Sequence, residues 1–248
     1  PAAVSSVAAA YVLLTLRRCY IIGVGSMAVE IKICGLTDLD EAVACVSAGA
    51  TAIGLVFHPP SPRHLTIAEA RDIVAVLPPH VARVGVFAES DAATILHIAT
   101  EVGLTTLQLH GHAAMAALSD LRARPFHLVA VLRNMATLLS DAARLPTDVG
   151  LLIECGEGPL PGGNAAVWNW GTAAAVAALR PFAIAGGITA GSVVEAITLS
   201  GATAVDVSSG VESTPGKKEI TKVRSLMNNV RTMVERDSAI VTDIRIFR

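Results

Sequence analysis

The chain has 248 residues, with 19 Lys plus Arg against 21 Asp plus Glu, so its net charge is −2. The chain therefore lacks the excess of positive charge that is typical of proteins that bind nucleic acid or an anionic membrane surface. Hydrophobic residues make up 52% and charged residues 16%, which excludes a largely disordered chain.

The first 26 residues differ from the rest. An apolar run, Ala8–Leu14, precedes two arginines, which is the reverse of the charge order in a signal peptide, and the run is too short to span a bilayer. A strand pattern begins directly after Met27, so we expect Met27 to be the natural start, with a real terminal helix as the alternative. The expected organisation is an N-terminal extension (1–26), a folded domain (27–236) and a C-terminal tail (237–248).

From Met27 onward, short aliphatic runs alternate with Ala- and Leu-rich segments of helical length. The expected strands are Val29–Cys34, Ala52–Phe57, Arg83–Ala88, Thr106–His110, Leu128–Leu132, Val149–Glu154, Phe182–Gly186 and Ala204–Ser208. The expected helices are Leu39–Ala48, Ile67–Leu77, Ala92–Val102, Ala113–Arg122, Ala136–Arg144, Thr172–Leu179, Ser192–Leu199 and Ile220–Val234.

This alternation predicts the fold class. Parallel strands that are buried on both faces read as continuous apolar runs, as these do. Eight strand–helix units in one chain of this length predict an α/β protein with a single-domain (β/α)₈ TIM barrel. An open, doubly wound sheet is the alternative, and it is disfavoured because no glycine-rich dinucleotide fingerprint follows the first strand.

The cysteines indicate a reducing compartment. Cys19, Cys34, Cys45 and Cys155 form no C-x-x-C pair and have no histidine spacing typical of zinc. We therefore expect a cytoplasmic protein without a metal site.

In a barrel of this class the site is built at the carboxyl ends of the strands, and the last two ends have the composition of a phosphate site. Gly186 and Gly187 follow the seventh strand, and Ser208–Gly210 follows the eighth. Glycines let backbone N–H groups approach an anion. Ordinary turn residues are the alternative interpretation.

Other strand ends carry groups that move protons or bind carboxylates. Strand alternation places Lys32 and Cys34 on one face and turns Glu154 inward, so a thiol and a carboxyl on opposite sides of the barrel mouth are a candidate acid/base pair. A packed core thiol and a solvated loop acid are the alternative interpretations. His110 is a third candidate proton carrier, or a structural hydrogen-bonding partner beneath the site. Arg63, in a stiff proline-rich loop, can clamp a carboxylate.

Several strings resemble those of the phosphoribosylanthranilate isomerases of tryptophan biosynthesis, from about Val29 to about Val234. In chain order they are Lys32–Gly35, Pro60–Arg63, Val84–Phe87, Gln108–Gly111, Ala185–Gly187, Asp206–Glu212 and Pro215–Lys218. Any one of them is weak evidence, and the whole set in the family's order is highly specific.

The resemblance implies an Amadori rearrangement of the phosphosugar N-(5′-phosphoribosyl)anthranilate, with no metal or cofactor. It makes Cys34 the general base, places Glu154 where the family has an acidic aspartate, and puts Arg63 near the anthranilate carboxylate. The expected catalytic residues are Cys34 and Glu154. The expected substrate-binding residues are Arg63, His110, Gly186, Gly187, Asp206, Ser208, Ser209 and Gly210.

Three departures from the family pattern affect the acid and the loop after it. Glu154 replaces the aspartate, Gly162–Ala165 and Trp168–Trp170 stand in place of the family's loop strings, and Glu89 replaces an asparagine. An impaired or regulatory barrel and an enzyme for another phosphosugar therefore stay open as alternatives. We expect no nucleic-acid or membrane partner, and a monomer or homodimer.

Overall fold

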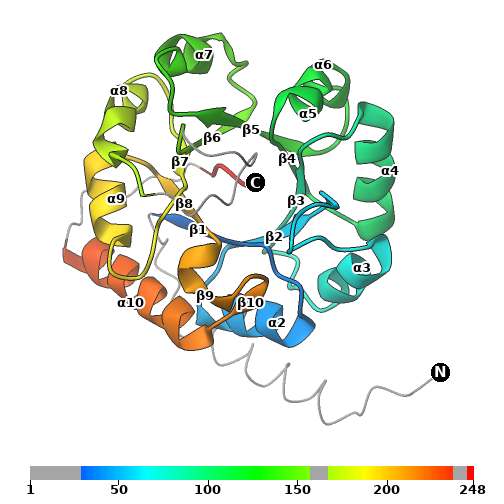
Figure 1. Cartoon of the computed structure of the whole chain (residues 1–248), viewed down its shortest axis with the longest axis horizontal. Helices are drawn as coiled ribbons and strands as arrows, with labels where there is room; N and C mark the ends of the chain where they lie inside the picture. The colour runs from blue at the N-terminus through cyan, green and yellow to red at the C-terminus, as the bar shows by residue number, and fades with distance from the viewer. Residues whose placement is uncertain (1–28, 157–166, 237–244) are drawn as a thin grey trace.

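The computed structural model describes residues 29–156, 167–236 and 245–248, and within them eight parallel strands close into a barrel surrounded by helices (Figure 1). The strands are hydrogen-bonded in chain order from β1 to β8, and β8 pairs with β1. This closure confirms the (β/α)₈ barrel and rules out the open sheet. The expected extension, residues 1–26, and the string Gly162–Ala165 lie outside the described residues.

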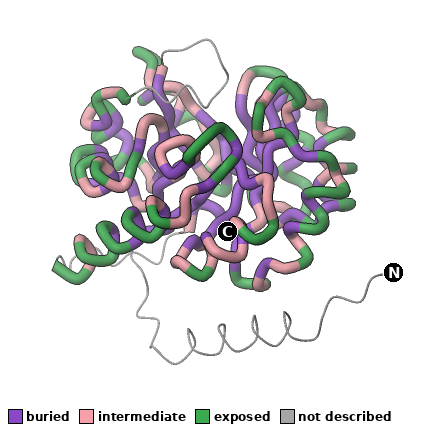
Figure 2. Tube along the Cα trace, turned by 60° about the horizontal axis from the view of Figure 1, so that its bottom comes forward, coloured by how far each residue is buried: buried purple, intermediate pink, exposed green. Residues whose placement is uncertain are grey.

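All eight expected strands are present. They are β1 (Glu30–Cys34), β2 (Ala52–Val56), β3 (Ala82–Phe87), β4 (Thr106–Leu109), β5 (His127–Arg133), β6 (Gly150–Glu154), β7 (Ala183–Ile184) and β8 (Ala204–Val207). Figure 2 shows buried positions running along these strands and exposed positions on the outer helical layer. The strands are buried because the helices cover their outer faces and the barrel interior covers the other.

The helices between the strands largely match those expected. They are α2 (Leu39–Ala48), α3 (Ile67–Ala75), α4 (Ala92–Val102), α5 (His112–Ala116), α6 (Leu118–Leu121), α7 (Leu138–Arg144), α8 (Ala174–Ala177), α9 (Val193–Ser200) and α10 (Ile220–Arg236). Side chains cap three of them: Asp38 accepts from the first turn of α2, Thr66 forms a capping box with Glu69 on α3, and Asp91 caps α4. None of the helices in the described part of the chain is long and apolar enough to cross a membrane.

Two expected helices differ from the prediction. The segment Ala113–Arg122 forms the two short helices α5 and α6. The segment Thr172–Leu179 starts as a 3₁₀ turn, η1 (Trp170–Ala173), before α8. Asn169 explains the tight turn, because its side chain accepts from the Gly171 N–H and its carbonyl accepts from the Thr172 hydroxyl.

A small antiparallel pair that was not predicted follows β8. After the 3₁₀ turn η2 (Ser209–Val211), the strands β9 (Glu212–Thr214) and β10 (Lys217–Lys218) pair across Pro215 and Gly216. Gly216 has φ +83°, which fits the third position of a type II turn after proline. The turn brings Lys218 back beside Glu212, and the two side chains form an ion pair.

Residues 245–248 fall in the expected C-terminal tail, yet they close the barrel at the amino ends of its strands (Figure 1). Phe247 is fully buried and Ile246 nearly so. Their backbone N–H groups donate to Glu30 Oε2 at 3.1 and 2.6 Å, and Thr106 Oγ1 donates to the Phe247 carbonyl at 2.6 Å. The interior residues around them include four alanines: Ala52, Ala82, Ala183 and Ala204.

These alanines explain why residues outside the strands fill the barrel interior at the amino ends of the strands. Interior layers of such barrels are ordinarily filled by bulky branched side chains of the strands themselves. Here the small side chains leave a space at the amino ends, and the ring of Phe247 fills it. Residues 245–248 therefore pack as part of the barrel.

Candidate active site

A cavity of about 530 Å³ opens at the carboxyl ends of the strands. Cys34 at the end of β1 and the segments after β2, β3, β4, β6, β7 and β8 contribute to its wall. All ten residues expected for the site line it: Cys34, Arg63, His110, Glu154, Gly186, Gly187, Asp206, Ser208, Ser209 and Gly210. The structure thus brings the whole predicted set together, while the role of each residue stays a prediction.

Glu154 stands at the end of β6 and is buried with His110, which follows β4. His110 Nε2 lies 2.7 Å from Glu154 Oε1, so one proton is shared in a hydrogen bond between them. Arg133, the register partner of Glu154 on β5, places its Nε 3.9 Å from the same oxygen. The histidine therefore contacts the carboxyl group directly, and the longer side chain of glutamate is held in one orientation.

Cys34 ends β1 on the other side of the cavity, three strands away from β6 around the barrel. Burial raises the pKa of its thiol, and the nearby ammonium group of Lys32 acts in the opposite direction. Gly54, the register partner of Cys34 on β2, keeps this corner open. A Cβ at Gly54 would lie 2.7 Å from Cys34 Sγ and 3.0 Å from Lys32 Cε, closer than packed atoms allow.

Lys32 lies below Cys34 on the same face of β1 and is fully buried. Its register partner on β8 is Asp206, and Lys32 Nζ lies 2.9 Å from Asp206 Oδ1. Although burial disfavours the charged form of Lys32, Asp206 and Cys34 hold its pKa above the ordinary value. An ion pair thus sits directly beneath the thiol.

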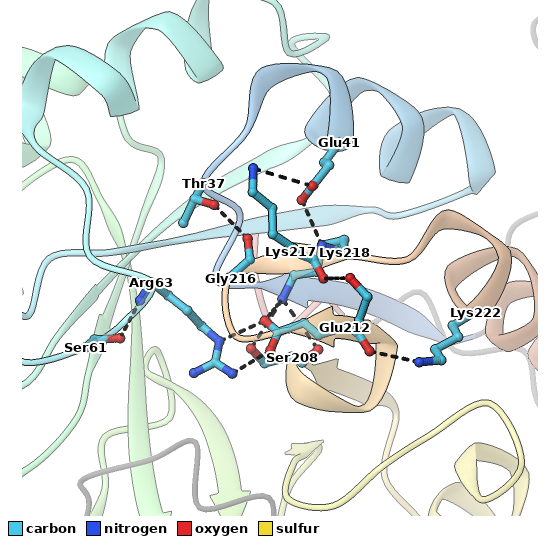
Figure 3. A network of polar contacts seen from close by, with 11 residues as sticks. Thr37, Glu41, Ser61, Arg63, Ser208, Glu212, Gly216, Lys217, Lys218 and Lys222 are labelled. Carbon is cyan, nitrogen blue, oxygen red and sulfur yellow. Dashed lines mark hydrogen bonds and ion pairs between the residues drawn. The ribbon is translucent and has the colours of Figure 1, made fainter.

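Arg63 lies at the mouth of the cavity, where it meets Glu212 of β9 (Figure 3). Arg63 Nε and Nη2 donate to the two carboxylate oxygens of Glu212 at 2.8 and 2.6 Å. Lys218 Nζ donates to Glu212 Oε1 at 2.5 Å and lies 3.5 Å from the hydroxyl of Ser208. One carboxylate therefore balances two cations, which leaves a net positive charge beside the loop after β8.

Further bonds fix the β9–β10 pair to the loop after β1 and to the helices α2 and α10 (Figure 3). Thr37 Oγ1 donates to the Gly216 carbonyl at 2.7 Å, the Lys218 N–H donates to Glu41 at 2.8 Å, and Lys222 Nζ donates to the Glu212 carbonyl at 2.9 Å. Reasoning from the sequence assigned no role to Glu212 or Lys218. The only signal was their presence in the two strings after the eighth strand.

The loops after β7 and β8 share one part of the cavity wall. Gly186 and Gly187 have φ +92° and +66°, and a Cβ on Gly210 would collide with the carbonyl oxygen of Ile188. The indole N–H groups of Trp168 and Trp170 donate to the carbonyls of Ala185 and Gly186 at 2.9 and 3.1 Å, which anchors the first loop. Glycine at these positions lets the backbone come close to a bound anion.

The described ranges contain no group of three or more His, Cys, Asp or Glu side chains placed to hold a metal ion. The groups in the cavity that can move a proton or bind an anion include the Cys34 thiol, the His110–Glu154 pair and the cations at its mouth.

Comparison with known proteins decides the family. The model of the family "N-(5'phosphoribosyl)anthranilate (PRA) isomerase" matches residues 31–229. The chain belongs to the phosphoribosylanthranilate isomerase family. A curated relative of that name from Desulfatibacillum aliphaticivorans is 39% identical over 206 residues, which cover 82% of this chain and 93% of the relative.

Solved structures of phosphoribosylanthranilate isomerases agree. The enzyme from Thermotoga maritima matches with a TM-score of 0.76 and 31% identity, covering 82% of this chain and 99% of that one. A structure of such an isomerase in complex with reduced 1-(o-carboxyphenylamino)-1-deoxyribulose 5-phosphate matches with a TM-score of 0.73 and 30% identity, with the same coverage. These findings confirm the family and the fold expected from the sequence, and with them an isomerase of tryptophan biosynthesis.

Proposed function

We propose that this chain converts N-(5′-phosphoribosyl)anthranilate to 1-(2-carboxyphenylamino)-1-deoxyribulose 5-phosphate, with Glu154 as general acid and Cys34 as general base. The observation that carries this assignment is the meeting of a thiol from β1 and a carboxyl from β6 in one cavity of about 530 Å³. A cavity of this size accommodates a small ligand.

The two groups act in sequence on opposite parts of the sugar. Glu154, protonated, donates its proton to the furanose ring oxygen, and the ring opens to a Schiff base. The thiolate of Cys34 then takes the proton from C2′, and the resulting enolamine becomes the ketone as C1′ gains a proton and the C2′ hydroxyl loses one. The reaction is an isomerisation, so no oxidant or cofactor is consumed.

The hydrogen bond between His110 and Glu154 supports Glu154 as the acid. Glutamate is one methylene longer than the family's aspartate, and a misplacement of about 1 Å can cost about 10²-fold in rate. His110 holds the carboxyl group at 2.7 Å, which limits that freedom. The same contact argues against an impaired barrel, because the acidic group is kept inside the cavity.

The remaining groups suit the two anionic ends of the substrate. Gly186, Gly187 and the Ser208–Gly210 loop would receive the phosphate through backbone N–H groups, with the net positive charge of the neighbouring cation cluster beside them. Glu212 accepts from Nε and from one N–H of Nη2, so the other N–H groups of Arg63, on Nη1 and Nη2, would donate to the anthranilate carboxylate. We expect the chain to work in the cytoplasm as a monomer or homodimer, without a cofactor.

The test is conversion of freshly generated N-(5′-phosphoribosyl)anthranilate by the purified chain, followed through the loss of its fluorescence, together with rescue of a tryptophan auxotroph that lacks this isomerase. The Cys34→Ala variant should lose at least about 10²–10⁴-fold in turnover while its circular dichroism is unchanged. Near-normal turnover in this variant would mean that another group, with His110 the nearest candidate, takes the C2′ proton.

A further inference from the structure

Lys32 is a buried cation that the mechanism above does not use. We propose that Lys32 is a positioning residue for the base, and that its ammonium group, held in place by Asp206, stabilises the thiolate of Cys34 against the apolar surroundings. The proposal rests on the proposed role of Cys34 as base. It assigns a task to the ion pair beneath the thiol, which a purely structural pair would not have.

The geometry confines Lys32 to this task. Its side chain has no exposure to solvent, and its Nζ is held 2.9 Å from Asp206 Oδ1 by strand register. Phe247 closes the space below, with Nζ 5.7 Å from the ring centroid. Gly54 keeps the space between Lys32 and Cys34 open, because both Lys32 Cε and Cys34 Sγ lie within 3.0 Å of where a Cβ on Gly54 would stand.

A buried thiol needs such a neighbour in order to act as a base. Only the thiolate accepts a proton, and burial opposes its formation. Four charged groups from four elements act on Cys34: Lys32 on β1, Asp206 on β8, Lys218 on β10 and Arg63 after β2. Among the cations, Lys32 is the one on the same face of the same strand, and a Cβ on Gly54 would lie 2.7 Å from Cys34 Sγ and 3.0 Å from Lys32 Cε.

The charges of Lys32 and Asp206 affect the equilibrium between the thiol and the thiolate of Cys34. With Lys32 and Asp206 both charged, the pair is neutral, and ionisation of Cys34 leaves one net negative charge in a buried site. Without the Lys32 charge, the same ionisation leaves two negative charges. Without the Asp206 charge, it leaves none. Lys32 therefore favours the thiolate and Asp206 opposes it, so removing one or the other should move the titration of Cys34 in opposite directions.

The experiment is the pH dependence of alkylation by iodoacetamide, measured without substrate, in the full chain and in Lys32→Met and Asp206→Asn. Cys34 lines the cavity, which gives a small reagent access. The Cys34→Ser variant supplies the background from the other cysteines. The midpoint of the alkylation profile should rise by about one pH unit or more in Lys32→Met and should fall in Asp206→Asn. The acid limb of the kcat/KM profile should move with it.

A double variant keeps the test decisive if Lys32→Met fails to fold because Asp206 is left unpaired. Lys32→Met/Asp206→Asn removes both charges of the pair, a change that folded proteins often tolerate. Its midpoint should lie above that of Asp206→Asn, since these two proteins differ only at Lys32.

Equal midpoints in that comparison, or single variants that lose activity without any shift in the titration, would overturn the proposal. Because alkylation needs no turnover, such a result would leave the isomerase assignment standing. Conversely, full activity in Cys34→Ala would show that Cys34 is not the base, whereas absence of turnover in the unsubstituted chain would show that the proposed function itself fails.

Discussion

Glu212 of β9 and Arg63 form a two-point ion pair at the cavity mouth, with Nε and Nη2 at 2.8 and 2.6 Å from the two carboxylate oxygens. Lys218 shares the same carboxylate. The guanidinium group is therefore oriented by the protein before any ligand arrives. With Arg63 in its proposed role at the substrate carboxylate, this preorganisation predicts that Glu212 contributes to substrate affinity.

Replacement of Glu212 with Gln should raise KM by about tenfold with a smaller effect on kcat, because Arg63 loses the partner that orients it. Loss of hydrogen bonds to charged groups should also cost about 1–3 kcal/mol of stability. The matched control is Asp148→Asn, which breaks a two-point pair with Arg122 on the exposed surface and should cost at most about 1 kcal/mol. A KM unchanged in Glu212→Gln would argue against this role of the pair.

The same residue predicts a stability change with pH. Burial tends to raise the pKa of Glu212, but its bonds to Arg63 and Lys218 outweigh this and hold the pKa below its usual range. A carboxyl group whose pKa is lower in the folded state contributes stability above its unfolded pKa of about 4.3. This contribution is lost as the pH falls through the pKa of the folded state. Denaturant unfolding should therefore show that the free energy of unfolding falls less between pH 6 and pH 3 in Glu212→Gln than in the unsubstituted chain.

The loops after β7 and β8 should respond to added negative charge if they bind phosphate. Ser209→Asp should raise KM by about tenfold or more, since two charges about 4 Å apart repel by about 4 kcal/mol at an effective dielectric constant of 20. Inorganic phosphate should compete with the substrate in the unsubstituted chain and should compete less well in the variant. Ser140→Asp, on exposed α7 away from the cavity, is the control. Equal KM values in the two variants would contradict a phosphate site here.

Phe247 should be as important for stability as a strand residue of the core. Its ring is fully buried among the barrel alanines, so Phe247→Ala should cost about 3–5 kcal/mol of unfolding free energy. Leu139→Ala on α7, where the side chain is 47% exposed, should stay within about 0.5 kcal/mol. Urea unfolding of the two variants measures the difference. A loss in Phe247→Ala no larger than in Leu139→Ala would show that the barrel closes without the C-terminal residues.

The strands could be predicted because each is a continuous apolar run in a regular repeat, and burial on both faces requires that pattern. Cys34 and Glu154 could be placed on one cavity for the same reason: they end strands whose carboxyl ends must meet at one rim of a closed barrel. Period-2 alternation along β1 also brings Lys32 to the face of Cys34.

Other features depend on contacts between distant parts of the chain, which local patterns do not encode. Glu212 and Arg63 are 149 residues apart in sequence and meet only after the barrel has closed. The β9–β10 pair is too short to show a strand pattern, and its only local sign is the Pro215–Gly216 turn. Phe247 lies in a segment with no regular periodicity, and the space that it fills is visible only once the alanines of β2, β3, β7 and β8 are seen on one inner surface.

Glu154 and Cys34 are proposed as the acid and the base of an isomerase. This claim is tested most directly at Glu154, where the resemblance leads us to expect an aspartate. The measurement is kcat with N-(5′-phosphoribosyl)anthranilate for the unsubstituted chain, Glu154→Gln and Glu154→Asp. The account predicts clear turnover in the unsubstituted chain, a loss of at least about 10² in Glu154→Gln and partial activity in Glu154→Asp. Full activity in Glu154→Gln would contradict Glu154 as the acid, and turnover seen only in Glu154→Asp would show that the natural chain is an inactive barrel.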